Sequence, residues 1–317
     1  MGVIEYLMTA SSVAFAKQLQ SAFAYESGRS AFTEVDQFRA LIRAFSGLKP
    51  HFFLEEFHGF KRQVYFDTSH SWQRPRARCE LCDVLFVVYS TNGGFGARVT
   101  LLQAKLSRET HATGLAASSG LIERQEFKAN FEQWNLLCAR PALIATTVFD
   151  PPPDLLSGAL LPSVGTFGVF HQSPSGPIDL FYVSADCLAP TTTPPGPDTR
   201  HGRLMTRHGG ASQRITGSWH EVTYSPTVFH FAQALYELSI GTPLVLAASG
   251  GTRTEFQPHY NWVRGVLAAH VGAAGANSPI ASALLADLGP PQDTLEPNKV
   301  PTLIVLRSEA PLNGPRG

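Results

Sequence analysis

Apolar residues recur every three or four positions in the first fifty residues, which is the spacing of an amphipathic helix. The clearest case predicts a helix over 33–46, with Thr33 as its N-cap and Gly47 at its end. Its apolar side chains are Val35, Phe38, Leu41, Ile42 and Phe45. A weaker pattern predicts an earlier helix over 11–24.

Short apolar runs rich in β-branched and aromatic residues follow, and they predict strands. A stripe of Phe127, Phe131, Trp134 and Cys138 then predicts a helix over 121–138, before a short apolar strand over 142–149. The predicted order from residue 31 to residue 150 is therefore α-β-β-β-α-β. Before the second helix, residues 51–57 and 62–66 are predicted as strands or as an extended excursion, and a hairpin follows with strands at 80–89 and 98–106.

The strands at 80–89 and 98–106 flank Asn92-Gly93-Gly94, a typical β-hairpin connection. If the hairpin is centred on Gly93, Asp83 lies opposite Gln103, and the numbers of all opposing residues add up to 186. Side chains alternate along a strand, so Gln103 and Lys105 share one face and Lys105 lies diagonally across from Asp83. The pattern thus gathers a carboxylate, an amide and an ammonium group.

Those three groups suit metal-assisted hydrolysis of a phosphodiester. Mg²⁺ or Mn²⁺ prefers oxygen ligands, often one or two carboxylates together with water and substrate phosphate oxygens. Such an ion activates a water and stabilises the charge that develops on the phosphoryl group. A neighbouring lysine positions that water or neutralises the same charge.

Asp83, followed on the next strand by Gln103-Ala104-Lys105, resembles the motif of the PD-(D/E)xK, or restriction-endonuclease-like, nuclease superfamily. The resemblance implies an α/β fold with an αβββαβ core, in which a mixed sheet is flanked by helices. It also implies metal binding by Asp83, assisted by Glu80, and by the carbonyl oxygens of Gln103 and Ala104, with Lys105 acting on the attacking water.

The sequence departs from the superfamily at Gln103, where Asp or Glu is usual. A structural hydrogen bond would satisfy this amide as well as a metal would. Another acid could complete the ligand set, and the alternatives to Glu80 are Glu34, Glu55 and Glu56. Glu34 in a first helical turn is equally explained by the helix dipole.

A basic stretch leads into the predicted site. Between residues 61 and 78 there is one acid, Asp67, and the basic residues are Lys61, Arg62, Arg74, Arg76 and Arg78. They predict contacts with nucleic-acid phosphates, although an ordinary exposed loop has a similar composition. The whole chain has 25 basic and 25 acidic residues, so any such contact depends on a local patch.

Composition favours a globular protein of the cytoplasm. Hydrophobic residues make up 44% of the 317 residues and charged residues 16%. Four cysteines are too few and too scattered for a disulfide framework. The N-terminal residues lack the pattern of a signal peptide, and no apolar run has the ~18 residues of a membrane-spanning helix.

We predict three parts: an N-terminal helical segment (1–30), a nuclease-like core (31–150) and a C-terminal α/β elaboration (151–317). Ser-Pro pairs at 225–226 and 278–279 predict helices that run to about residues 240 and 287. The Pro- and Gly-rich stretch 189–214 is expected to be a mobile loop. Further strands are predicted at 164–170, 178–183, 245–248 and 301–306.

The functional hypothesis is a Mg²⁺- or Mn²⁺-dependent DNA endonuclease of restriction or phage defence, with RNA as an alternative substrate. It would act as a homodimer or beside a partner subunit, and it has no membrane partner. The main alternative is a catalytically degenerate relative that serves as a nucleic-acid-binding or scaffold subunit. A third reading is a protein-interaction module in which the polar strand residues are structural. The defence role rests on family analogy alone.

Overall fold

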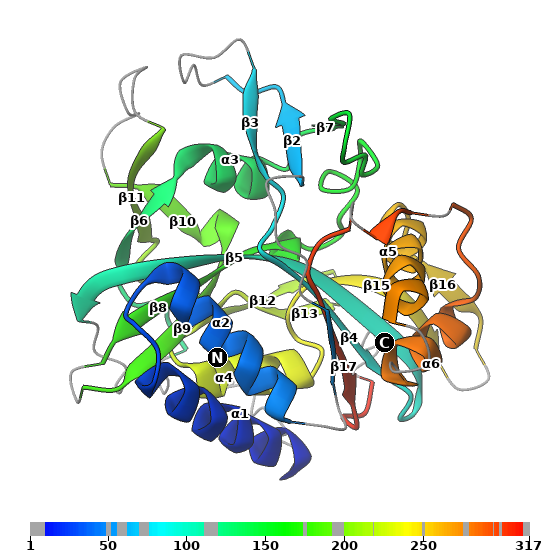
Figure 1. The fold of residues 1–317 in the computed structure, drawn as a ribbon, viewed down its shortest axis with the longest axis horizontal. Coiled ribbons are helices and arrows are strands. Elements are labelled where there is room, and N and C mark those ends of the chain that lie inside the picture. Colours follow the sequence, from blue (N-terminus) through cyan, green and yellow to red (C-terminus); the bar gives the residue numbers. More distant parts are fainter. Residues whose placement is uncertain are drawn as a thin grey trace.

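The computed structural model describes most of the chain (Figure 1). Its residues are 10–48, 52–55, 62–69, 76–110, 120–173, 176–191, 200–217, 219–248, 251–274, 279–293, 295–297 and 300–312. They form a mixed α/β fold in which helices flank a mixed sheet, as the sequence predicted. None of the helices in these residues is long and apolar enough to cross a membrane.

A mixed sheet of nine strands forms the centre of the fold. Strands from both sides of residue 150 share it, because β4 and β5 pair in parallel with β17 and β8 respectively. The main order is β1 (Phe52–Glu55), β17 (Leu303–Ser308), β4 (Val84–Ser90), β5 (Gly94–Thr110), β8 (Gly165–Gln172), β9 (Ile178–Ser184) and β14 (Tyr224–Ser225). Strands β15 (Thr242–Ala248) and β16 (Arg253–Glu255) branch from β5.

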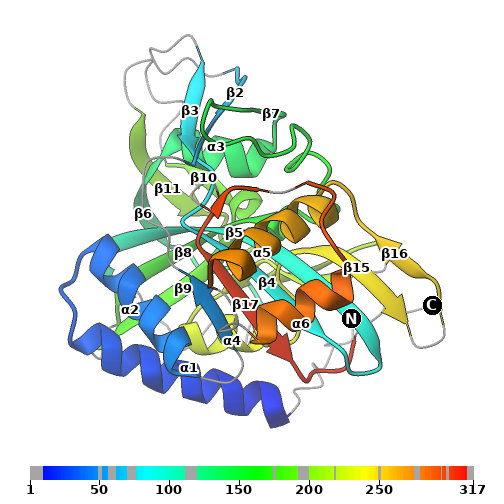
Figure 2. The same ribbon diagram turned by 45° about the vertical axis from the view of Figure 1, so that its right-hand side comes forward.

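Three helices cover one face of this sheet: α1 (Ala10–Gly28), α2 (Glu34–Gly47) and α4 (Val228–Tyr236) (Figure 2). The Phe86 ring of β4 lies between Phe45 of α2 and Phe231 of α4, with centroid separations of 5.4 and 5.9 Å. Both early helices were predicted. The Thr33 hydroxyl caps α2 by accepting a hydrogen bond from the Asp36 amide at 3.2 Å.

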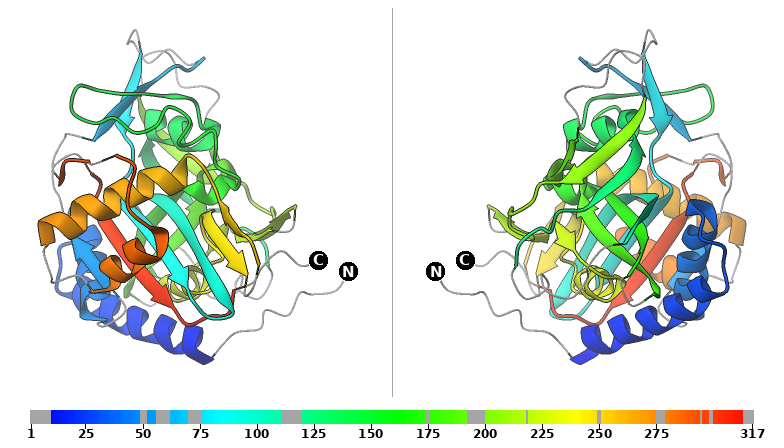
Figure 3. Two further views of the ribbon diagram at one scale, coloured as in Figure 1. Left: turned by 90° about the vertical axis from the view of Figure 1, so that its right-hand side faces the viewer. Right: turned by 90° about the vertical axis from the view of Figure 1, so that its left-hand side faces the viewer.

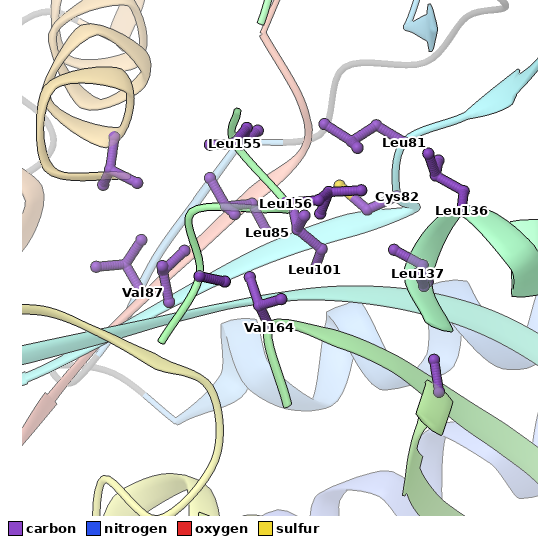
Figure 4. Close-up of a cluster of buried hydrophobic side chains, with 14 of the residues drawn as sticks. Leu81, Cys82, Leu85, Val87, Leu101, Leu136, Leu137, Leu155, Leu156 and Val164 are labelled. Carbon is purple, nitrogen blue, oxygen red and sulfur yellow. The ribbon is translucent and has the colours of Figure 1, made fainter. Parts of the chain in front are cut away.

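The opposite face packs against α3 (Phe131–Ala139), α5 (His259–Ala274) and α6 (Pro279–Leu288). Figure 4 shows part of this core, where Leu85 and Leu101 of the central strands meet Leu136, Leu137 and Leu156. Cys79 and Cys82 are buried in the same cluster as free thiols. Helix α6 begins at the predicted Pro279, whereas α5 was not predicted.

Three smaller sheets complete the fold. Strands β2 (Gln63–Phe66) and β3 (Ala77–Glu80) stand above α3 in Figures 1 and 3, with β7 (Leu143–Ile144) at the other edge of β2. The second sheet contains β10 (Leu188–Pro190), β11 (His201–Thr206) and β6 (Glu126–Asn130). The third contains β12 (Gln213–Thr216) and β13 (Trp219–Val222), and short 3-10 turns lie at Pro162–Val164 and Ala185–Cys187.

The predicted hairpin register is confirmed between β4 and β5. Val84 pairs with Leu102 and Ser90 pairs with Gly96, so opposing residues follow the predicted rule. The predicted strand at 80–89 is nevertheless divided. Strand β3 ends at Glu80 and pairs with β2, and the chain bends through residues 81–83 before β4 begins. Glu80 therefore ends a strand of one sheet, and Asp83 lies in the bend that leads to a strand of another.

The predicted helix over 121–138 is wrong in its first half. Residues 126–130 form β6, in which buried Phe127 and Ala129 alternate with exposed Lys128. This period of two is that of a strand. Asn130 then caps α3 by accepting a hydrogen bond from the Glu132 amide at 2.8 Å. Only Phe131, Trp134 and Cys138 of the predicted stripe are helical.

Two further predictions are corrected at loops. The strand expected over 142–149 is limited to β7, because the Thr146 hydroxyl accepts hydrogen bonds from the Val148 and Phe149 amides and forms a turn. The stretch 189–214 is not one loop, because β10 ends, β11 lies and β12 begins within it. Gly202 of β11 permits close contact with Phe131, since a Cβ there would lie 2.3 Å from the ring.

The helix predicted after Ser225-Pro226 begins later. Ser225 ends β14, and Thr227 is the N-cap of α4, with its hydroxyl accepting a hydrogen bond from the His230 amide at 3.3 Å. The Asp179 carboxylate accepts a hydrogen bond from the Val228 amide at 2.8 Å. The helix ends at Tyr236, four residues before the predicted end.

Candidate functional site

The Ala104 peptide unit is the centre of the candidate site. Strand β5 pairs with β4 only as far as Leu102. Beyond that point the Ala104 amide donates a hydrogen bond to the Asp83 carboxylate at 2.6 Å, and the Asp83 amide donates to the Leu102 carbonyl at 3.0 Å. Asp83 thereby takes the place of a further strand residue and is held beside Gln103 and Lys105.

Lys105 approaches the same peptide unit from the next position. Its ammonium group donates to the Ala104 carbonyl at 2.6 Å and to the Glu34 carboxylate at 3.2 Å. Lys105 is only 7% exposed, whereas the Glu34 side chain is 46% exposed at the start of α2. Glu34, one of the alternative acids, therefore contacts the lysine.

Gln103 is fully buried, and both ends of its amide are used. Its nitrogen donates to the Glu80 carbonyl at 3.1 Å, and its oxygen accepts a hydrogen bond from Gln133 of α3 at 2.9 Å. These bonds fix which end of the amide faces the site. The oxygen keeps a second lone pair for another partner, because a carbonyl oxygen accepts two hydrogen bonds.

The negative charges of Glu80 and Asp83 are only partly compensated by neighbouring positive charges and hydrogen bonds. Burial and the nearby Asp83 carboxylate raise the pKa of Glu80 to about 7. Burial also raises the pKa of Asp83, although Lys105 and the Ala104 amide partly oppose this shift. A cation placed between the two carboxylates would relieve both effects.

The site offers oxygen atoms of the kinds that bind Mg²⁺ or Mn²⁺ in proteins. They include two carboxylates with raised pKa values, an amide oxygen and a backbone carbonyl, and Mg²⁺ commonly uses one or two carboxylates. Within the residues that the structure describes, no three His, Cys, Asp or Glu side chains form a metal-binding group. A metal would therefore need Gln103, Ala104, water or substrate to complete its coordination.

The other predicted residues lie in different settings. Glu55 pairs through its backbone with Leu303 in the β1–β17 ladder. Arg62 is 5% exposed and donates to the Thr302 hydroxyl at 3.5 Å, so it is too buried to reach a phosphate. Burial lowers the pKa of Arg62, and the nearby Cys82 and Glu80 oppose this. Three further predictions, Glu56, Lys61 and Arg74, lie outside the described residues.

Arg76 and Arg78 both line a cavity of about 580 Å³ that reaches Glu80. A second cavity of about 540 Å³ reaches Lys105 and Glu34. The two share Asn130, Gln133 and His201, so they lie on either side of one ridge. Glu80 thus borders the first cavity, and Lys105 and Glu34 border the second, whereas Asp83, Gln103 and Ala104 line neither.

Sequence reasoning missed Gln133, Asn130 and His201, which come from α3, the end of β6 and β11. The misassigned helix at 121–138 gave Asn130 and Gln133 no role, and the expected loop at 189–214 gave none to His201. One signal was available, because Asn130 precedes the better helical pattern and is a favoured N-cap residue.

Comparison of this chain with protein-family models, with curated proteins and with solved structures gave no match. The functional argument therefore rests on the site itself.

Proposed function

We propose that this protein is a metal-dependent nuclease built on a restriction-endonuclease-like core. One observation supports the proposal above the others: Asp83 and Lys105 converge on the Ala104 peptide unit, with Glu80, Glu34 and Gln103 around them. This grouping contains the acid, the carbonyl oxygens and the lysine that hydrolysis of a phosphodiester requires.

Each side chain has a role in this proposal. Asp83 and Glu80 would hold Mg²⁺ or Mn²⁺ together with the Gln103 oxygen and the Ala104 carbonyl. Such an ion supplies Lewis acidity and an activated water when bound. Lys105 orients the attacking water or stabilises charge on the phosphoryl oxygens, and Glu34 holds its ammonium group in place. Arg76 and Arg78 contact flanking phosphates from the cavity wall.

A second candidate is the degenerate relative, which binds nucleic acid without cleaving it. The observation that favours it is the amide of Gln103, which has protein partners at both ends and adds no negative charge. In that case the Gln103–Gln133 contact is structural, and the two cavities are a binding surface only.

The test is cleavage of supercoiled plasmid and of single-stranded circles in millimolar Mg²⁺ or Mn²⁺ and in EDTA. Asp83→Asn and Lys105→Met should abolish metal-dependent cleavage while circular dichroism stays unchanged. Asp293→Asn is the matched control, because Asp293 is exposed and lies outside both cavities.

Full cleavage by either site variant would refute the assignment of the active site. An inactive wild-type protein that still binds DNA would establish the second candidate. A protein that neither binds nor cleaves DNA would refute both candidate functions.

A further inference from the structure

The cavity beside Glu80 has a wall built from one face of the β2–β3 pair. Val64, Phe66, Ala77 and Cys79 are buried in the core, so the alternate residues of the two strands turn away from it. Those residues are Gln63, Tyr65, Arg78 and Glu80, and all four line the cavity. The cavity wall is therefore flat, polar and continuous with the candidate site.

Tyr65 and Arg78 form a stacking platform on this wall. They are direct cross-strand partners, and the Arg78 guanidinium lies over the Tyr65 ring at 5.2 Å from its centroid. A planar guanidinium and an aromatic ring each offer a flat face to a nucleic-acid base. His201 lines the same cavity and belongs to the ridge that separates it from the second one.

The spacing along β3 links this platform to the reacting groups. Arg78 and Glu80 are two residues apart on one face, which is roughly 7 Å along a strand. Glu80 lines the first cavity, whereas Lys105 lines the second. A phosphodiester held between Glu80 and Lys105 would therefore have room for one neighbouring nucleoside in each cavity.

We propose that this surface binds an unpaired nucleic-acid strand, with one base stacked on Tyr65 and Arg78 and the scissile phosphate held between the two cavities. This inference rests on the proposed function. Each cavity has a volume in the usual range for a small ligand, about 300–1,000 Å³, and this suits single nucleotides better than a duplex.

The chemistry of the walls also favours an unpaired strand. Bases in a duplex are stacked on one another, so a protein meets their edges and the phosphates but not their faces. A strand that is already single presents its base faces without the cost of unstacking, and aromatic platforms recognise it with little dependence on sequence. Lys128, which lines the second cavity, supplies positive charge for the continuing backbone, whereas Arg203 there pairs with Glu109 and Glu126.

The test is equilibrium binding in EDTA, measured by fluorescence anisotropy with a short single-stranded DNA and with the blunt duplex of the same sequence. EDTA keeps the measurement independent of cleavage. The single strand should bind at least about tenfold more tightly than the duplex, and Tyr65→Leu should reduce that affinity about tenfold.

The matched control is Tyr25→Leu. Tyr25 of α1 also carries an arginine over its ring, with Arg29 at 5.1 Å from the centroid, but it lines neither cavity. Its loss should leave binding unchanged. Unfolding curves for both variants separate a lost contact from a lost fold.

Tighter binding of the duplex, or equal effects of the two tyrosine variants, would overturn the inference while leaving the nuclease proposal open to its own cleavage assay. Selective binding of the single strand without cleavage would support the inference and refute the nuclease proposal. Absence of any binding would overturn the inference.

Discussion

Two groups of charged side chains below the surface differ in how their charges are balanced. Arg214 of β12 forms two hydrogen bonds with Asp186, at 2.5 and 3.2 Å, and one with the fully buried Glu221. Ser184 and the Ser163 amide satisfy further carboxylate oxygens of this group. The site around Asp83 instead gathers Glu34, Glu80 and Asp83 about Lys105, and the buried Arg62 lies near Glu80.

The pKa values record the same difference. Burial alone would raise the pKa of Asp186, but hydrogen bonds from Arg214 and Ser184 bring it below its usual value. The pKa of Arg214 is raised by its two carboxylate partners despite burial. At the candidate site burial instead raises the pKa of Asp83, and it raises that of Glu80 to about 7. Uncompensated charge of this kind is more common at functional sites than in structural networks.

Removing the cation of the structural network should have the largest effect on stability. Arg214→Met leaves Asp186 and Glu221 buried without their partner, so the free energy of unfolding should fall by about 3–5 kcal/mol. Urea denaturation measures this. The control is Arg124→Met, which removes an exposed pair with Glu126 and should cost less than about 1 kcal/mol. Similar losses in the two variants would contradict the comparison.

Stability of the candidate site should depend on pH through Glu80. Its folded pKa of about 7 exceeds its unfolded value of 4.5, so its contribution is fully present below pH 4.5 and is lost as the pH rises through 7. The loss is on the order of 2–3 kcal/mol. Glu80→Gln should remove it, and unfolding curves across this pH range test that.

Repeating the same unfolding experiment in Mg²⁺ tests whether Glu80 is a metal ligand. If Asp83 and Glu80 hold the ion, Mg²⁺ should stabilise the wild type above pH 7 more than it stabilises Glu80→Gln, because only the folded site binds it. Identical pH profiles for wild type and variant would show that Glu80 is not coupled to this site.

Gln103 separates a metal ligand from a structural amide. Gln103→Leu removes both hydrogen bonds and should cost about 1–3 kcal/mol, and it should also abolish the response to Mg²⁺. Gln103→Glu adds negative charge beside Glu80 and Asp83, so it should destabilise the protein in EDTA and recover stability in Mg²⁺.

The control for these variants is Gln37→Leu. Gln37 of α2 is also fully buried, its amide donates to the Ala31 carbonyl at 2.9 Å, and it lines neither cavity. It should lose stability without any change in the Mg²⁺ response. An unchanged Mg²⁺ response in Gln103→Leu would exclude Gln103 as a ligand.

Lys105→Met should cost less stability than Arg214→Met, about 1–2 kcal/mol, because Glu34 is nearly half exposed and regains water, whereas the buried Asp83 loses a compensating charge. Cleavage should nevertheless fall by about a hundredfold or more, because the group that faces the developing charge is lost. Paired measurements of unfolding and cleavage test this contrast with Arg214→Met. A loss of stability as large as that of Arg214→Met would make Lys105 a structural residue.

Local patterns in the sequence predicted the hairpin well. Its register follows from Gly93 and from the alternation of Val84, Phe86 and Val88 toward one face and Leu85 and Val87 toward the other. The same reasoning placed Asp83 opposite Gln103. It could not reveal that Asp83 leaves the strand and accepts a hydrogen bond from Ala104, because this depends on where β4 ends.

Non-local contacts account for most of what was missed. Gln133 reaches Gln103 across 30 positions, and Glu34 reaches Lys105 across 71. His201 lines both cavities because β11 pairs with β6, and the same pairing places Gly202 opposite Ala129. No periodicity within a single segment carries this information. The stacking platform of Tyr65 and Arg78 likewise depends on the pairing of β2 with β3.

The end of the β4–β5 ladder at Leu102 has one further consequence. The groups that Asp83 and Lys105 hold at position 104 belong to the main chain, and every amino acid except proline would supply both of them. The Ala104 side chain packs in the core on the face of the sheet that α1, α2 and α4 cover, so packing and not chemistry constrains it. Replacing Ala104 by another small apolar residue should therefore leave both contacts in place, whereas extending the β4–β5 pairing by one residue pair should displace Asp83 from the Ala104 amide without altering any side chain.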